Sequence, residues 1–399
     1  MKKHFLVLFF CAATIGLFAQ EERKPVIEIA GTMTSDIGYN FNQVNPSYFD
    51  VMRPTQLPAF RNQYGSDGNV YFSVRQSYLG LKSYTQTSLG ELYIRFAFDL
   101  FGVGADAGKT TFHMLYAYAE LGKLGVGHNW SLFSDFDGYP NIIEYWGPVG
   151  MSLAKNVQIR FIPLNGKNRL AIALERPGAS ADEGIYADRI ELQDVKPRFN
   201  LPDLSAEFRL TRDWGYTELA GIVRKIEWVD QGQEAYDLSG KAVGWGLNLS
   251  TKLKLTRNDE FIGQAVIGEG IQNYMNDGPT DIAVQKDFGN AEAPVKGVTL
   301  PIVSFSTYLN HQWNKKFSSA IGFSMVDTGN SDGQNDDSFS KGYYSSCNLL
   351  YYPVPNVVAG AEVIWIKREN YNDGWSTSAT KIQFTFKYSF SKAFYANEI

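Results

Sequence analysis

The residues best able to do chemistry are scarce in this 399-residue chain and form no catalytic set. The histidines are His4, His113, His128 and His311. The sequence contains no HExxH helix motif, no paired-cysteine metal spacing and no G-x-S-x-G nucleophile elbow. We therefore expect no metal, no cofactor and no catalytic centre. We interpret His113 and His128 as residues of a wall or its rim.

Arginines in segments of alternating polarity are the more informative group. Each lies among polar residues of one parity and opposes the apolar face of its segment; they are Arg75, Arg95, Arg160 and Arg209. A guanidinium binds a carboxylate through two parallel hydrogen bonds, so these side chains are candidate pore-lining groups that attract anions. The alternative is that acids such as Glu91, Asp99 and Glu207 pair with the arginines and merely keep a polar interior satisfied.

The segment Gly125–Gly150 combines aromatic rings, acids and turn residues without a helical or strand period. We interpret it as a loop that folds into a barrel and narrows it. Its candidate constriction residues are Trp130, Phe133, Asp135, Asp137 and Glu144. We expect the two aromatic residues to wedge the loop against the wall and the acids to face Arg75, Arg95 and Arg160. That arrangement would create a transverse field across a narrow channel.

Short alternating segments must position these residues. Ile382, Phe384 and Phe386, for example, alternate with Lys381 and Gln383. About 16 such segments follow one another, including one at 69–84 that carries Arg75 and a last one at 376–390. The connections near 40–68, 131–154, 177–202 and 270–299 are long, whereas those between them are turns of a few residues. This asymmetry predicts an all-β fold: a 16-stranded antiparallel transmembrane β-barrel with an inward-folded constriction loop.

The N-terminus has the pattern of an export signal. Basic Met1-Lys2-Lys3-His4 precedes the apolar stretch 5–18, so we expect a signal peptide at 1–19, a barrel domain at 20–390 and a short periplasmic tail at 391–399. The mature part has no apolar run long enough for a transmembrane helix, and its single cysteine, Cys347, excludes an internal disulfide. A net charge of −5 gives no basic patch that would indicate a nucleic-acid partner.

Four motifs resemble the DcaP-like family of outer-membrane porins; they are the segments 74–81 (VRQSYLGL), 116–120 (YAYAE), 126–135 (VGHNWSLFSD) and 147–150 (GPVG). The resemblance implies a homotrimer of barrels in the outer membrane that takes up small anionic solutes, especially dicarboxylates. It also implies that Arg75 lines the lumen and that Gly127 to Phe133 opens the constriction loop. The sequence departs from the family where it has Tyr78 and Leu115, since basic residues are frequent at those two places.

Together these observations predict a passive diffusion channel in the outer membrane of a Gram-negative bacterium, with lipid and small polar or anionic solutes as partners. Two alternatives stay open. Tyrosine and tryptophan could instead serve a soluble or surface β-sandwich that binds glycans. A barrel-embedded enzyme would need a serine and a histidine within hydrogen-bond distance at the outer rim.

Overall fold

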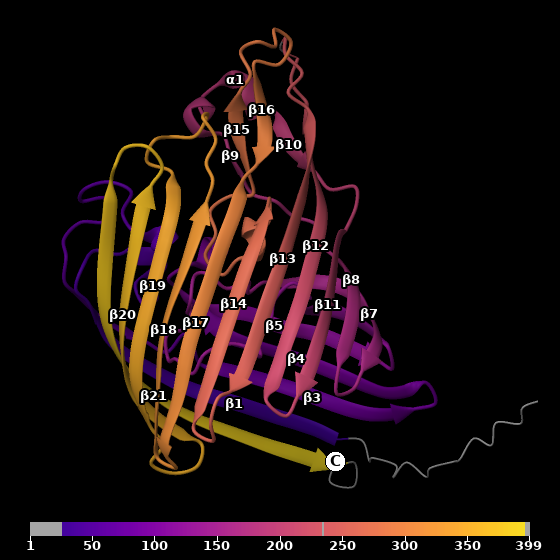
Figure 1. Cartoon of the computed structure of the whole chain (residues 1–399), viewed down its shortest axis with the longest axis vertical. Coiled ribbons are helices and arrows are strands. Elements are labelled where there is room, and N and C mark those ends of the chain that lie inside the picture. The colour runs from indigo at the N-terminus through magenta and orange to yellow at the C-terminus, as the bar shows by residue number, and fades with distance from the viewer. Residues whose placement is uncertain (1–25, 234, 396–399) are drawn as a thin grey trace, which may run out of the picture.

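Sixteen antiparallel strands close into one barrel in the computed structural model, which describes residues 26–233 and 235–395 (Figure 1). The wall strands are β1 (Val26–Asn40), β3 (Tyr78–Thr87), β4 (Gly90–Phe101), β5 (Thr110–Leu121), β6 (Leu124–Trp130), β7 (Lys155–Asn165), β8 (Arg169–Glu175), β11 (Asp203–Arg212), β12 (Gly215–Asp230), β13 (Gly240–Lys254), β14 (Asp259–Glu269), β17 (Pro301–Asn314), β18 (Phe317–Thr328), β19 (Phe339–Tyr351), β20 (Val357–Asn370) and β21 (Ser376–Tyr395). β21 pairs with β1 along the whole of β1, which closes the sheet. The predicted 16-stranded barrel is confirmed, and the β-sandwich alternative is wrong.

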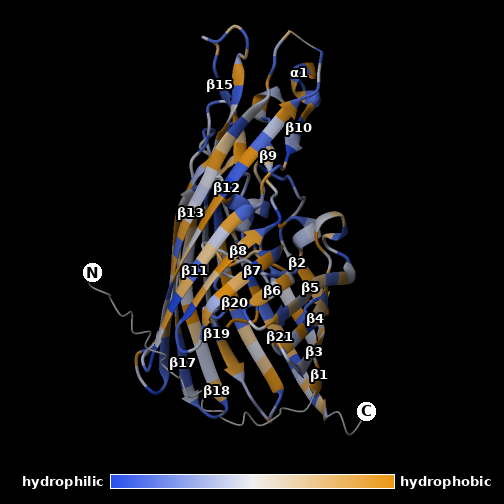
Figure 2. Cartoon of the chain, turned by 90° about the vertical axis from the view of Figure 1, so that its right-hand side faces the viewer, coloured by the Kyte–Doolittle hydropathy of each residue, from blue (hydrophilic) through white to orange (hydrophobic). Residues whose placement is uncertain are grey.

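Alternation along each strand sorts side chains between the two faces of the wall. On β21, Phe384, Phe386 and Tyr388 point outward and are each about half exposed, whereas Lys381 and Gln383 point inward and are fully buried. Hydrophobic and hydrophilic residues are accordingly interleaved along the wall strands (Figure 2). An apolar outer face suits the hydrocarbon of a bilayer. The sheet also closes on itself, so no strand edge leaves its backbone groups unpaired in lipid. None of the helices within 26–233 and 235–395 has the length and apolar character needed to cross a membrane.

Connections of very different length join the strands at the two ends of the barrel. Two-residue turns link β3 to β4, β5 to β6 and β17 to β18, and the last of these lies at the bottom of Figure 1. The connections 41–68, 131–154, 176–202 and 270–300 lie at the other end. The expected asymmetry is therefore present.

Short elements decorate the long connections. They are β2 (Asn69–Ser73), β9 (Ala181–Asp182), β10 (Val195–Arg198), β15 (Ile282–Lys286), β16 (Val295–Thr299), α1 (Ile190–Gln193), η1 (Pro46–Tyr48), η2 (Pro54–Gln56), η3 (Gly104–Asp106), η4 (Gly184–Tyr186) and η5 (Gln272–Tyr274). β9, β15 and β16 form a small separate sheet that stands above the barrel with α1 (Figure 1). Of these elements only β2 and β10 join the barrel sheet, where they pair with β1 and β12.

The strand expected at 69–84 is two strands. β2 pairs with residues 36–40 of β1, and β3 pairs with residues 26–32 of the same strand. Between them the backbone turns, with the Ser77 amide donating to the Val74 carbonyl at 3.0 Å. Arg75 lies in this turn, so its side chain is placed by the break and not by strand alternation.

The last strand extends beyond the expected boundary at 390. Residues 391–395 continue β21 and pair with residues 26–30 of β1, so the predicted tail at 391–399 begins inside the barrel wall. Alternation fails to show this because Ser391 and Lys392 interrupt the aromatic pattern, yet the backbone of β1 still needs a hydrogen-bonding partner there. The predicted signal peptide at 1–19 lies outside the described residues.

Three connections fold into the lumen, where the sequence predicted one. We name them the first inward loop (41–68), the constriction loop (131–154) and the third inward loop (270–281). Buried apolar residues from all three, including Met52, Phe133 and Ile271, pack on inward apolar residues of β12 to β20, such as Ile302 and Ile364. We call this side of the lumen the plugged half.

Candidate permeation pathway

The constriction loop crosses the barrel through a series of contacts, first with the neighbouring strand β8 and then with β13. At its start, the Glu175 carboxylate accepts hydrogen bonds from the Ser131 hydroxyl at 2.8 Å and the Leu132 amide at 3.3 Å. Farther on, the Asn248 side-chain amide on β13 donates to the Phe133 carbonyl at 2.7 Å. The buried backbone of the loop therefore finds its partners in side chains of the wall.

The acidic tip of the loop binds one arginine. Arg209 on β11 forms ion pairs with Asp135 at 2.9 Å and Glu218 at 2.6 Å, and a third with Asp137. The Tyr216 hydroxyl donates a further hydrogen bond to Asp135 at 2.8 Å. Three carboxylates share this one guanidinium, so Asp135 and Asp137 hold the loop to the wall.

Glu144 plays the same anchoring role at the centre of the loop. Its carboxylate accepts hydrogen bonds from the Met52 amide at 2.8 Å and the Gly147 amide, and it lies 3.5 Å from the Lys381 ammonium. Burial raises the pKa of the Glu144 carboxyl above its usual range, and Lys381 opposes that rise. Glu144 thus joins the constriction loop to the first inward loop and to β21.

The returning arm of the loop lies directly against β14, β17 and β18. The Gly150 amide donates to the Ser324 hydroxyl at 3.0 Å, and the Gly150 carbonyl accepts from the Ser304 hydroxyl at 2.8 Å. The Ser152 amide donates to the Gln264 side chain at 2.6 Å. A side chain at position 150 would overlap the carbonyl oxygens of Phe305 and Met325, so only glycine permits this approach.

A buried aspartate locks the three inward loops together. Asp277, with no exposed surface, accepts hydrogen bonds from Arg53 Nε at 2.9 Å and from the Thr55 amide at 2.9 Å. The Arg53 guanidinium lies 4.0 Å from the ring centre of Trp146, whose indole donates to the Asn276 carbonyl at 2.8 Å. These contacts fix the shape of the constriction from the plugged half.

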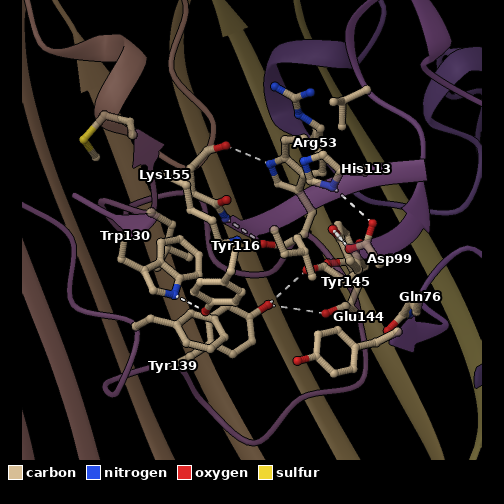
Figure 3. Close-up of a pocket in the computed structure, with 18 of the residues that line it drawn as sticks. Arg53, Gln76, Asp99, His113, Tyr116, Trp130, Tyr139, Glu144, Tyr145 and Lys155 are labelled. Atoms are coloured by element: carbon tan, nitrogen blue, oxygen red, sulfur yellow. Dashed lines mark hydrogen bonds and ion pairs between the residues drawn. The ribbon is translucent and has the colours of Figure 1, made fainter. Parts of the chain in front are cut away.

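The open part of the lumen lies between the constriction loop and the wall formed by β3 to β7 and β21. This cavity has a volume of about 740 Å³. Tyr116 and Trp130 from the wall and Tyr139 and Tyr145 from the loop line it (Figure 3). We call this side of the lumen the open half. The loop adheres to the plugged half, so this cavity lies in the open half.

Positive charge in the cavity is incompletely balanced. Arg95, Lys155 and Lys387 line it, and none of the three has a carboxylate within ion-pair distance in the part of the chain that the structure describes. Arg95 Nε is buried without a hydrogen-bond partner. The acid Asp99 also lines the cavity, but it accepts hydrogen bonds from the Tyr145 hydroxyl at 2.5 Å and lies 3.1 Å from His113 Nδ1.

Only one of the four candidate arginines lines this cavity. Arg75 is 1% exposed, pairs with Asp50 at 2.6 Å and lies over the Phe101 ring, so it ties the first inward loop to the wall. Arg160 is also buried and donates to the Trp130 carbonyl at 2.6 Å. Arg209 anchors the loop tip, as described above. All four were expected to line the pore, and only Arg95 lines the cavity.

The expectation that the loop acids face Arg75, Arg95 and Arg160 is wrong. Asp135 and Asp137 pair with Arg209, and Glu144 pairs with Lys381. The reason is steric and electrostatic: a loop buried against one wall must satisfy its charges at that wall, because an unpaired buried charge is costly. The loop acids therefore do not face the wall arginines across the channel. They are paired in the plugged half, whereas the cations of the open half have no carboxylate partner among the described residues.

Among the constriction residues, Phe133 is fully buried in the plugged half, whereas Trp130 lines the cavity. Sequence reasoning missed Lys155, which shares the parity of Val157 and Ile159, two outward residues. Lys155 is the first residue of β7, where the chain leaves the loop, and its ammonium turns inward and lies 3.8 Å from the Trp130 ring centre. The cross-strand pairing of Trp130 with Lys155 would have been the usable signal.

A closed antiparallel barrel of 16 strands, narrowed by a loop from its interior, defines an outer-membrane channel of the porin type. The model of the DcaP outer membrane protein family matches residues 20–390, and the chain belongs to this family. The expected family and its place in a Gram-negative outer membrane are thereby confirmed.

Solved structures show the same fold. The outer membrane channel DcaP of Acinetobacter baumannii superposes with a TM-score of 0.76 at 17% identity, covering 92% of this chain and 98% of that one. The anion-selective porin from Comamonas acidovorans gives 0.59 at 10% identity, with 92% and 100% covered. The trimer form of OmpT from Vibrio cholerae gives 0.55 at 9%, with 92% and 100% covered. No curated protein sequence matches this chain.

Proposed function

We propose that this channel mediates passive diffusion of small hydrophilic solutes and favours anions, dicarboxylates among them. The observation that carries the proposal is the set of three cations in the open half, Arg95, Lys155 and Lys387, which lack carboxylate partners in the described residues. In a narrow cavity with low-dielectric walls, uncompensated positive charge raises the local concentration of anions.

The reversal potential of the channel in a planar bilayer tests this preference. With a tenfold gradient of potassium chloride across the membrane, we expect a reversal potential of the sign set by chloride. A dicarboxylate such as succinate, placed on one side, should also carry current. A reversal potential of the sign set by potassium would overturn the anion preference.

We further propose that the chain assembles as a homotrimer. The trimeric OmpT of Vibrio cholerae has the same fold. In this chain β2 and β5 carry outward aromatic residues, Phe72 and Phe112, that are 70% and 77% exposed in the single copy. Such surface favours either lipid or another copy of the chain. Electrophoresis of the unheated, detergent-extracted protein should show a band of three chains, and a single-chain mass in mild detergent would refute the trimer.

A further inference from the structure

Aromatic rings occupy the same wall of the cavity as the unpaired cations. The Arg95 guanidinium carbon lies 3.4 Å from the ring centre of Tyr116, and the Lys155 ammonium lies 3.8 Å from that of Trp130. The Trp130 indole N–H donates to the Tyr116 hydroxyl at 2.7 Å, so the two rings are joined across the wall (Figure 3). Cations held over ring faces in this way are positioned before any solute arrives.

The constriction loop adds a further ring to this wall. Phe136 stacks on Trp130 with ring centres 4.5 Å apart and an angle of 16° between the planes. Its other neighbour is Tyr139, whose ring centre lies 5.4 Å away. Phe136 is nevertheless 43% exposed and lines the cavity. An apolar ring exposed inside a charged passage indicates a surface on which part of a solute can stack.

Charge and ring together define one class of solute. We propose, on the basis of the anion preference above, that the open half holds a subsite for aromatic carboxylates. Arg95 and Lys155 bind the carboxylate, and the ring of the solute stacks on Phe136. Both cations line the cavity and have no carboxylate partner among the described residues, so a solute carboxylate can pair with them there.

The ring contact separates this class from other anions of similar size. An offset or edge-to-face aromatic pair is stabilised beyond its area of burial, whereas a saturated ring gains only the burial. Benzoate and cyclohexanecarboxylate have the same charge and nearly the same size, so they form a matched pair of probes. A cavity that selects by charge and width alone would treat them alike.

Single-channel recordings with each probe measure the difference. We expect benzoate to interrupt the ion current with an apparent dissociation constant roughly threefold to tenfold lower than that of cyclohexanecarboxylate. Equal constants in a channel that is anion-selective overturn the aromatic subsite and leave the anion preference standing. A channel without anion selectivity overturns both.

Two variants assign the effect to the proposed residues. Phe136→Leu should bring the ratio of the two constants close to one while the reversal potential stays unchanged, and Lys155→Gln should weaken both probes and keep the ratio. The control Phe60→Leu alters an exposed ring outside the cavity and should change neither value. The heat-dependent shift in electrophoretic mobility verifies that each barrel is folded. A ratio that persists in folded Phe136→Leu overturns the proposal.

Discussion

The two halves of the lumen are built from the same alternating strands but filled in opposite ways. In the plugged half, inward residues such as Ile222 and Ile364 pack against the inward loops. In the open half, inward residues such as Arg95 line the cavity. One half thus has the interior of a globular protein, and the other has the interior of a channel.

The strands of the plugged half show what this difference means for a sequence. On β12, Ile222 and Ile226 are buried inside while Leu219 and Val223 are each 53% exposed outside. A strand that is apolar on both faces cannot line a wet passage alone, since its inner face has to be covered. Two-sided apolar strands in a porin sequence therefore indicate where loops fold in.

The largest effect on stability is expected at Asp277, which joins the inward loops. Replacing Asp277 by alanine leaves Arg53 largely buried without its partner, and breaking such a pair costs about 3–5 kcal/mol. The urea-induced unfolding of the detergent-solubilised protein should shift by that free energy, and conductance should rise and become noisier. Asp213→Ala, at a fully exposed turn residue, is the control. Unchanged conductance in Asp277→Ala would show that the loops are held elsewhere.

A smaller effect on stability is expected at Gly150, where the constriction loop contacts the wall. Gly150→Ala puts a methyl group against the backbone of β17 and β18, and overpacking of this kind costs about 1–3 kcal/mol. We expect reduced stability and a lower conductance, because the loop is pushed toward the open half. Gly289→Ala, where the methyl group meets no atom within 4 Å, should behave as the unmodified protein. An increase in conductance would mean that the loop moves out of the lumen instead.

The smallest effect on stability, with the largest on selectivity, is expected in the open half. The double variant Arg95→Gln and Lys155→Gln removes two cation–ring contacts, each worth about 1 kcal/mol or less. The ratio of anion to cation permeability should fall toward one, most clearly at low salt, where screening is weak. Lys167→Gln changes an exposed lysine outside the cavity and should leave the ratio intact. Selectivity that survives in the double variant would exclude these two residues as its source.

The wall could be predicted from the sequence because alternation and turn length are local. Lys381 and Gln383 face inward as the pattern requires, and the segment 131–154 folds inward as expected. The inner side of the barrel could not be predicted in the same way. Whether Arg75 faces solute or binds Asp50 depends on a loop whose path is set by contacts far along the chain.

Alternation also fails to predict the direction of a side chain at strand ends and where a strand is interrupted. Lys155 turns inward against its parity, and Arg75 lies in a turn that interrupts a strand. The first and third inward loops gave no signal of their own, since a buried loop is recognised only by the apolar strands that it covers. Phe133 and Glu144 were assigned to the correct loop, but their partners are on walls that the sequence does not bring together.

We propose that solute passes along the open half and not along the plugged half. Cysteine modification tests it most directly in a Cys347→Ser background, because Cys347 is the free cysteine among the described residues. Lys155→Cys places a thiol in the cavity, and Ser306→Cys places one on the inner face of the plugged half, where Ser306 is 3% exposed. We predict that a bulky methanethiosulfonate reagent removes most of the current through Lys155→Cys and none through Ser306→Cys. Block through Ser306→Cys with none through Lys155→Cys would show that solute passes along the plugged half instead.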